Sequence, residues 1–149
     1  MEALPFKKIL TEVLGEYGFI RKGTSYYKDG GEVYCVIGLQ KSNFSNSYMI
    51  NIGYFIKAIE SVMMKSKSTE GHLTNRFSSY NFGKLERHFN LDTLSEIDAE
   101  KLHSSFRQNI SKFLADGLSI QGLKDILTKE PALMNVLHIK AQKYLFGEP

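Results

Sequence analysis

The N-terminal segment has the hydrophobic spacing of an amphipathic helix. Pro5 suits the first helical turn, where its missing N–H would have no partner, and Gly18 suits the left-handed residue that follows a helix. Apolar side chains recur every three or four residues between them, at Phe6, Ile9, Leu10, Val13, Leu14 and Tyr17. The pattern predicts a helix from Pro5 to Tyr17.

The next part of the chain has a pattern with a period of two, as β-strands do. Turn residues separate it into three segments. The segments are 19–28, 32–40 and 48–56, and Asp29-Gly30-Gly31 between the first two is a strong tight-turn signal. Segment 32–40 is apolar on both faces, which is typical of a central strand. Because the connections are short, these strands are predicted to form an antiparallel meander, to which residues 72–80 could add a fourth strand.

Helical spacing returns in the last third of the chain. Ser95 with Asp98, or Thr93 with Glu96, fits a capping box at the start of the first helix. Its apolar stripe runs from Ile97 to Leu114 and ends at Gly117. Two further helices are predicted over 119–127 and, after Pro131, over 131–146.

The remaining connections are less regular. Residues 58–64 fit either a helical turn or an extension of the preceding strand, 65–69 read as a polar loop tip, and 81–92 as a connection that can hold one helical turn at 85–89. The chain shows no repeat and no long linker. The predicted fold is one α+β domain over 1–149, with an antiparallel sheet of three to five strands packed against the N-terminal helix and about three C-terminal helices.

Composition excludes several classes of protein. The chain has 149 residues, of which 42% are hydrophobic and 23% charged, as in globular domains rather than disordered chains. No apolar run approaches the ~20 residues that cross a bilayer, and the first residues lack the features of a secretory signal. The single cysteine, Cys35, cannot form an intramolecular disulfide, so a cytoplasmic location is expected.

The patterns of common catalytic and metal sites are missing. The four histidines are scattered singly, so spacing predicts no metal site and no cofactor. Cys35 lies in the middle of a predicted strand, where a buried, unreactive thiol is expected. Asp98-Ala99-Glu100-Lys101 opens a helix, where acidic residues favour the helix dipole. An enzyme is therefore not the favoured interpretation, although the sequence leaves it open.

Polar residues near the ends of two apolar strands form the main candidate site. Gln40, Lys41 and Ser42 end one strand, and Asn51 lies in the next. A buried carboxamide must find hydrogen-bond partners, so these residues either fix the strand register or border a small polar pocket, with Lys41, Ser42 and Arg76 on its rim.

Two glycines lie near these carboxamides. Gly38 and Gly53 are each two residues from one of them. If the two glycines share a face of the sheet, a helix or a ligand could approach the backbone closely.

The basic charge and the aromatic residues suggest a second function. Residues 1–80 hold ten Lys and Arg against seven Asp and Glu, whereas 81–149 hold nine of each. Aromatic residues interleaved with basic ones are what a platform for single-stranded nucleic acid uses, but aromatic residues are also common in sheets. The aromatic residues concerned are Tyr26, Tyr27, Tyr34, Phe44, Tyr48, Tyr54 and Phe55.

Several short motifs resemble a bacterial family described as domain of unknown function 4304. They are Gly18-Phe19-Ile20-Arg21-Lys22-Gly23, Gln40-Lys41-Ser42, Asn51-Ile52-Gly53 and an arginine after a short polar strand, Arg76. Many members carry a tryptophan-rich segment after that arginine, whereas this chain has no tryptophan and carries 77–89 there. The resemblance implies a bacterial origin but no activity, cofactor or catalytic residue.

The favoured interpretation is a non-catalytic binding or protein-interaction module. Its candidate site residues are Gln40, Lys41, Ser42, Asn51 and Arg76, and its partner would be a protein or a small polar ligand, not a membrane. A second copy could also pair through a sheet edge. The alternative is a small enzyme or a nucleic-acid-binding factor that uses the basic, aromatic half.

Overall fold

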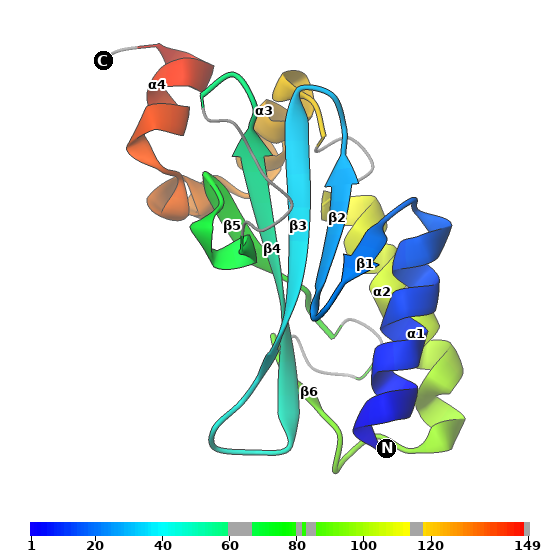
Figure 1. Cartoon of the computed structure of the whole chain (residues 1–149). Coiled ribbons are helices and arrows are strands. Elements are labelled where there is room, and N and C mark those ends of the chain that lie inside the picture. The colour runs from blue at the N-terminus through cyan, green and yellow to red at the C-terminus, as the bar shows by residue number, and fades with distance from the viewer. Residues whose placement is uncertain (60–66, 80–81, 83–85, 114–117, 148–149) are drawn as a thin grey trace.

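The structure is a computed structural model of the whole chain and describes residues 1–59, 67–79, 82, 86–113 and 118–147. The α-helices are α1 (Ala3–Glu16), α2 (Ala99–Phe113), α3 (Ile120–Lys129) and α4 (Ile139–Phe146) (Figure 1). The strands are β1 (Ile20–Lys22), β2 (Ser25–Asp29), β3 (Val33–Lys41), β4 (Ser47–Ile56), β5 (Leu73–Arg76) and β6 (Phe89–Asn90). Short 3₁₀ helices are η1 (Ser68–Glu70), η3 (Glu96–Asp98) and η4 (Pro131–Val136).

The strands form one antiparallel sheet in the order β1-β2-β3-β4-β5, and β6 pairs with β4 beside this path. This confirms the predicted α+β fold with an antiparallel meander. β3 lies in the centre of the sheet, as its two apolar faces predict. The turn between β2 and β3 forms as expected, because Gly31 has a φ of 96° and its N–H donates to Asp29 Oδ1 at 2.9 Å.

The first predicted strand is instead a hairpin. Residues 20–22 and 25–29 pair with each other, with Lys22 opposite Ser25. The chain reverses at Gly23, whose φ of 61° is readily adopted only by glycine. Gly23, which in the sequence interrupts one predicted strand, therefore marks the turn between two strands.

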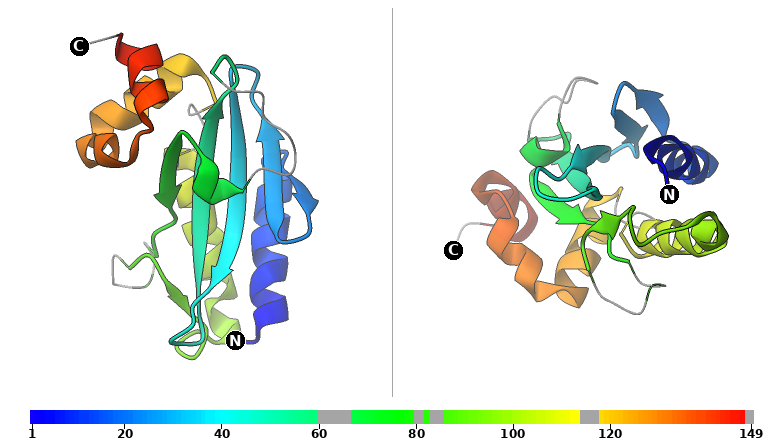
Figure 2. Two further views of the ribbon diagram at one scale, coloured as in Figure 1. Left: turned by 60° about the vertical axis from the view of Figure 1, so that its left-hand side comes forward. Right: turned by 90° about the horizontal axis from the view of Figure 1, so that it is seen from below.

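Helices α1 and α2 lie side by side along the sheet (Figures 1 and 2). The apolar stripe of α1 is buried as predicted, and it shares one core with the strand residues that point to the same face. On that face β3 contributes Val33, Cys35 and Ile37. The opposite face carries a second, smaller cluster, formed by Tyr27, Tyr34, Val36 and Phe55.

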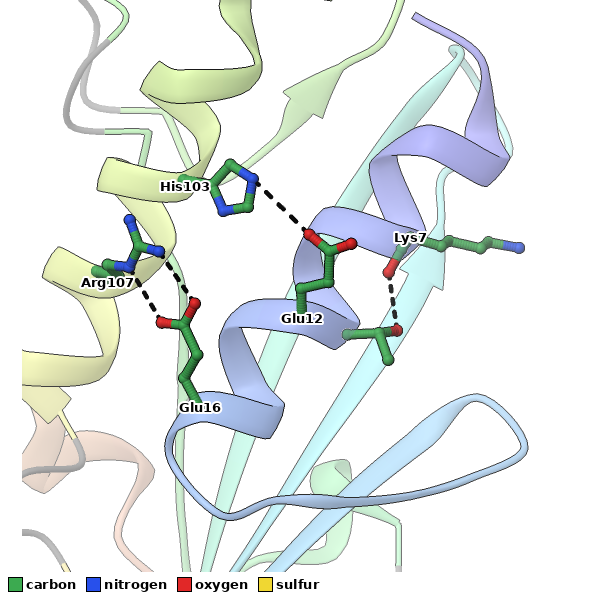
Figure 3. Close-up of polar contacts among 6 residues, drawn as sticks. Lys7, Glu12, Glu16, His103 and Arg107 are labelled. Atoms are coloured by element: carbon green, nitrogen blue, oxygen red, sulfur yellow. Dashed lines mark hydrogen bonds and ion pairs between the residues drawn. The ribbon is translucent and has the colours of Figure 1, made fainter.

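The outer surfaces of α1 and α2 meet through polar pairs (Figure 3). Arg107 donates two hydrogen bonds to the carboxylate of Glu16, at 3.2 and 3.0 Å, and His103 Nε2 lies 3.9 Å from Glu12. The hydrogen bond from Arg107 lowers the pKa of Glu16, and the same bond raises the pKa of Arg107. Because Arg107, Glu16 and Glu12 are solvent-exposed, these pairs orient the two helices more than they stabilise the fold.

The C-terminal region differs from the prediction in one helix. The expected helix over 131–146 is divided into η4 and α4, because Leu137 is extended between them. The backbone N–H of His138 donates to the carbonyl of His72 at 2.7 Å, and the His138 side chain accepts the N–H of Lys140. The helix over 119–127 forms as α3, with Ser119 accepting the N–H of Gly122.

The capping box of the first C-terminal helix is also confirmed. Asp98 accepts the N–H of Ser95 at 2.8 Å. Ile97 does not belong to the buried stripe, since it lies in the preceding 3₁₀ turn and is 89% exposed.

Some expectations fall on residues that the structure does not describe. These are most of 58–64, the first residues of the 65–69 loop, residue 85 of the expected turn at 85–89, and the helix end at 114–117. Two described parts differ from expectation: Ser68 is buried within η1, and residues 86–89 form no helical turn, since Phe89 begins β6. Within the described residues, no helix combines the length and the apolar character needed to cross a membrane.

Candidate functional site

Three of the predicted site residues come together on one face of the sheet. Gln40 lies near the end of β3, Asn51 in the middle of β4 and Arg76 at the end of β5. Asn51 is directly opposite Arg76 on one side and Gly38 on the other. Directly opposed residues of antiparallel strands share a face, so the register itself gathers these side chains.

The three side chains form a hydrogen-bonded chain across the strands. Arg76 Nε donates to Asn51 Oδ1 at 2.8 Å, and Asn51 Nδ2 donates to Gln40 Oε1 at 2.9 Å. Because a guanidinium can only donate, the oxygen of Asn51 must face Arg76 and its nitrogen must face Gln40. The amide nitrogen of Gln40 remains at the outer end of this chain.

The two strand glycines admit η1 close to the sheet, which confirms the expected close approach. A Cβ on Gly38 would lie 2.6 Å from Ser68 Oγ, and one on Gly53 would lie 2.2 Å from the carbonyl oxygen of Ser68. Gly71 packs as closely, since a Cβ there would lie 2.8 Å from the Cα of Gly53. The glycines therefore receive a segment of the chain itself, and that segment becomes one wall of a pocket.

A pocket of about 490 Å³ opens between this wall, β5 and η4. In Figure 1 the C-terminal segment lies beside β5, on the side away from α1, and η4 contacts β5 directly. None of the described residues around the pocket is acidic. They are Asn51, Ser68, Thr69, Thr74, Asn75, Arg76, Arg87, Ala132, Leu133 and Val136.

Asn75 and Arg87 are polar residues of this pocket that were not predicted as site residues from the sequence. Asn75 Oδ1 accepts both the backbone N–H of Arg76, at 2.8 Å, and Arg87 Nη1, at 3.2 Å. Asn75 Nδ2 is buried and has no partner among the described residues. Asn75 could have been found from the sequence, because an asparagine at a core-facing strand position is unusual. Arg87 could not, because it lies in an irregular connection with no local pattern.

Lys41 and Ser42 lie apart from the hydrogen-bonded chain. Lys41 Nζ donates to the carbonyl of Ser45 and to Asn46 Oδ1, at 3.1 and 2.9 Å. Ser42 Oγ accepts the N–H of Phe44 within the β3–β4 loop. Lys41 still lines a neighbouring pocket of about 580 Å³ that shares Asn51 with the first.

Among the described residues that line the pocket beside Arg76, there is no histidine and no acidic residue. His72 is buried, and its Nδ1 accepts the N–H of Ile56 at 2.8 Å, so that nitrogen is occupied by the backbone. Among the described residues, no group of three or more His, Cys, Asp or Glu is placed to hold a metal ion.

The aromatic residues do not form an exposed stacking platform. Of the seven considered, Phe44 is 98% exposed and stands alone in the β3–β4 loop. The other six are buried in the two clusters of the sheet, at Tyr26, Tyr27, Tyr34, Tyr48, Tyr54 and Phe55.

Cys35 is fully buried opposite Tyr54, and burial raises the pKa of its thiol. Because the thiolate is the reactive form, we expect the native protein not to react with dithionitrobenzoate over an hour at pH 8, and the urea-unfolded protein to react completely within minutes. Absorbance of the released thiolate measures both rates. Complete reaction of the native protein within minutes would show that the thiol is accessible.

The sequence comparisons agree with the short motifs. A family model described as a domain of unknown function, DUF4304, matches residues 10–131. No curated protein and no solved structure shows significant similarity to the chain. The match spans all six strands of the sheet and ends at the first residue of η4.

Proposed function

Because the chain belongs to the DUF4304 family, whose description names no activity, we propose from the pocket itself that the protein is a non-catalytic binding module for a small polar ligand. The ligand occupies the pocket between η1, β5 and η4, in contact with Asn51 and Arg76. The observation that carries this proposal is the convergence of oriented polar side chains on a pocket with an apolar wall, formed by Leu133 and Val136.

The polar side chains are positioned before any ligand arrives. Asn51 is held from both sides, by Arg76 and by Gln40, and Arg87 is held by Asn75. Such preorganisation reduces the ordering cost of binding, because the side chains do not have to be immobilised by the ligand. A network that only fixed the strand register would not require the adjoining pocket.

The composition of the pocket favours binding over catalysis. Its described lining contains Ser68, Thr69 and Thr74 but no His, Asp, Glu, Cys or Lys that could act as a general base. A hydroxyl without a neighbouring base is a weak nucleophile, so hydrogen bonding is the chemistry that these groups supply. The buried Cys35 is consistent with the reducing cytoplasm of a bacterial cell as the location.

A pocket fits the binding role better than the sheet edge at β1. That strand has three residues, of which Arg21 and Lys22 are basic, and short, charged edges discourage pairing with another chain. At the other edge of the sheet, β5 is in contact with η4. A second copy or a protein partner is therefore the less favoured occupant.

A ligand screen with a blocked pocket tests the proposal. A library of neutral, anionic and cationic polar fragments is added to the ¹⁵N-labelled full chain, and amide shifts are recorded. We expect binders to perturb residues 74–76 and 132–136. Val136→Trp should abolish these perturbations, because position 136 is half-exposed on the pocket wall and an indole there fills the space.

Ile139→Trp is the matched control. Ile139 is 64% exposed in the adjacent helix and does not line this pocket, so binding should be unchanged. The proposal fails if no fragment perturbs the pocket, or if Val136→Trp binds as well as Ile139→Trp does.

A further inference from the structure

Several hydrogen-bond donors of the pocket residues are unused among the described residues. Arg76 uses only Nε, towards Asn51, and its two terminal nitrogens have no partner among the described residues. Arg87 uses Nη1, towards Asn75. The buried Nδ2 of Asn75 is a further donor without a partner within the described chain. Leaving a buried donor unsatisfied is energetically costly, and an acceptor that reached it would offset that cost.

The two guanidinium charges are positioned but not neutralised. Each is held by the neutral amide oxygen of an asparagine, and the ion pairs found among the described residues involve other cations. Glu130 lies in an adjoining pocket that Arg87 also lines, but its carboxylate pairs with Lys112. Two like charges that line one pocket, with no counter-ion among the described residues, favour a bound anion there.

Arginine is also the side chain whose geometry best matches an oxyanion. Its planar N–H groups bind carboxylate and phosphate oxygens in pairs, with charge-assisted hydrogen bonds that are stronger than neutral ones. Asn51 holds Arg76 through Nε, so the two terminal nitrogens of Arg76 remain available to bind an oxyanion. The hydroxyls of Ser68 and Thr69, which also line the pocket, can donate to the same ligand.

We propose that this pocket binds the oxyanion group, phosphate or carboxylate, of a small ligand, and that Arg76 and Arg87 bind it together. This inference rests on the proposed function and specifies the chemistry of its ligand. Asn51 and Asn75 are positioning residues, which hold the two guanidinium groups at the pocket.

Titration of the full chain with inorganic phosphate and, separately, with acetate tests the inference. At constant ionic strength, set with chloride, we expect saturable shifts of the Nε–H signals of Arg76 and Arg87. Arg87→Gln should weaken anion binding at least tenfold. Arg76→Gln should do the same, and its amide spectrum and thermal unfolding show whether it is folded. Arg87 is exposed, so Arg87→Gln is expected to fold normally.

Arg21→Gln is the control with the same change of charge, at an exposed position on β1 away from the pocket. It should change anion affinity less than twofold. Binding of phosphate alone, or of acetate alone, would support the inference and identify the group. Equal weakening by Arg21→Gln, or no saturable shift with either anion, would overturn it.

The fragment screen separates this inference from the proposed function. Fragments that bind the pocket while neither phosphate nor acetate gives a saturable shift would leave the binding module standing and refute the oxyanion. A pocket that binds neither fragments nor anions would refute both.

Discussion

Gly53→Ala should lower the free energy of unfolding by about 1–3 kcal/mol, the usual cost of overpacking. An added Cβ would lie 2.2 Å from the carbonyl oxygen of Ser68 and 2.9 Å from its Cα. These are backbone atoms, so η1 as a whole must move away from the sheet. Because Ser68 and Thr69 line the pocket, binding of any ligand there should weaken as well. Urea unfolding at pH 7 measures the loss of stability.

Gly15→Ala is the matched control for this substitution. Gly15 lies in α1, and a Cβ there would have nothing within 4 Å. Alanine is favoured over glycine inside a helix, so this variant should gain about 0.5–1 kcal/mol. Opposite signs are expected for the two substitutions, and an unchanged unfolding midpoint for Gly53→Ala would contradict the close packing of η1.

Phe106→Ala should have the largest effect, a loss of about 3–5 kcal/mol, because it opens a cavity where three other rings meet. Phe106 is fully buried, and its ring centroid lies 5.7, 6.2 and 5.4 Å from those of Phe6, Phe77 and Phe89. These rings join α1, α2 and the chain on either side of the 80–85 segment. The same urea unfolding measures the loss.

Phe44→Ala provides the comparison, since it removes the same ring from a side chain that is 98% exposed. Its unfolding free energy should stay within about 0.5 kcal/mol of the wild type. If Phe106→Ala fails to fold, Phe106→Leu should retain the fold with a smaller loss. Equal stability of Phe106→Leu and the wild type would show that the ring cluster contributes nothing.

The parts of the fold that local spacing encodes were predicted well. The buried stripe of α1, the turn at Asp29-Gly30-Gly31 and the alternation of β3 and β4 depend on residues two to four positions apart. One error occurs where a distant contact decides. The last predicted helix is broken at Leu137 because the next residue, His138, donates to the carbonyl of His72.

The candidate site shows the same division. Gln40, Asn51 and Arg76 stand out in the sequence as polar residues in or beside apolar strands, and the antiparallel register brings them together. Lys41 and Ser42 adjoin Gln40 in sequence, but the β3–β4 loop binds both. Arg87 joins the site from a connection whose path no local pattern describes.

The sequence by itself therefore determined the fold class, the central position of β3 and the polar character of the strand ends. Those properties follow from hydrophobic periodicity and turn chemistry, which act between near neighbours. Only the tertiary structure decided that η1 lies on Gly38 and Gly53, and that Asn75 and Arg87 complete a pocket without acidic residues among its described lining. Those contacts join segments far apart in the chain, and their partners are chosen by packing rather than by spacing.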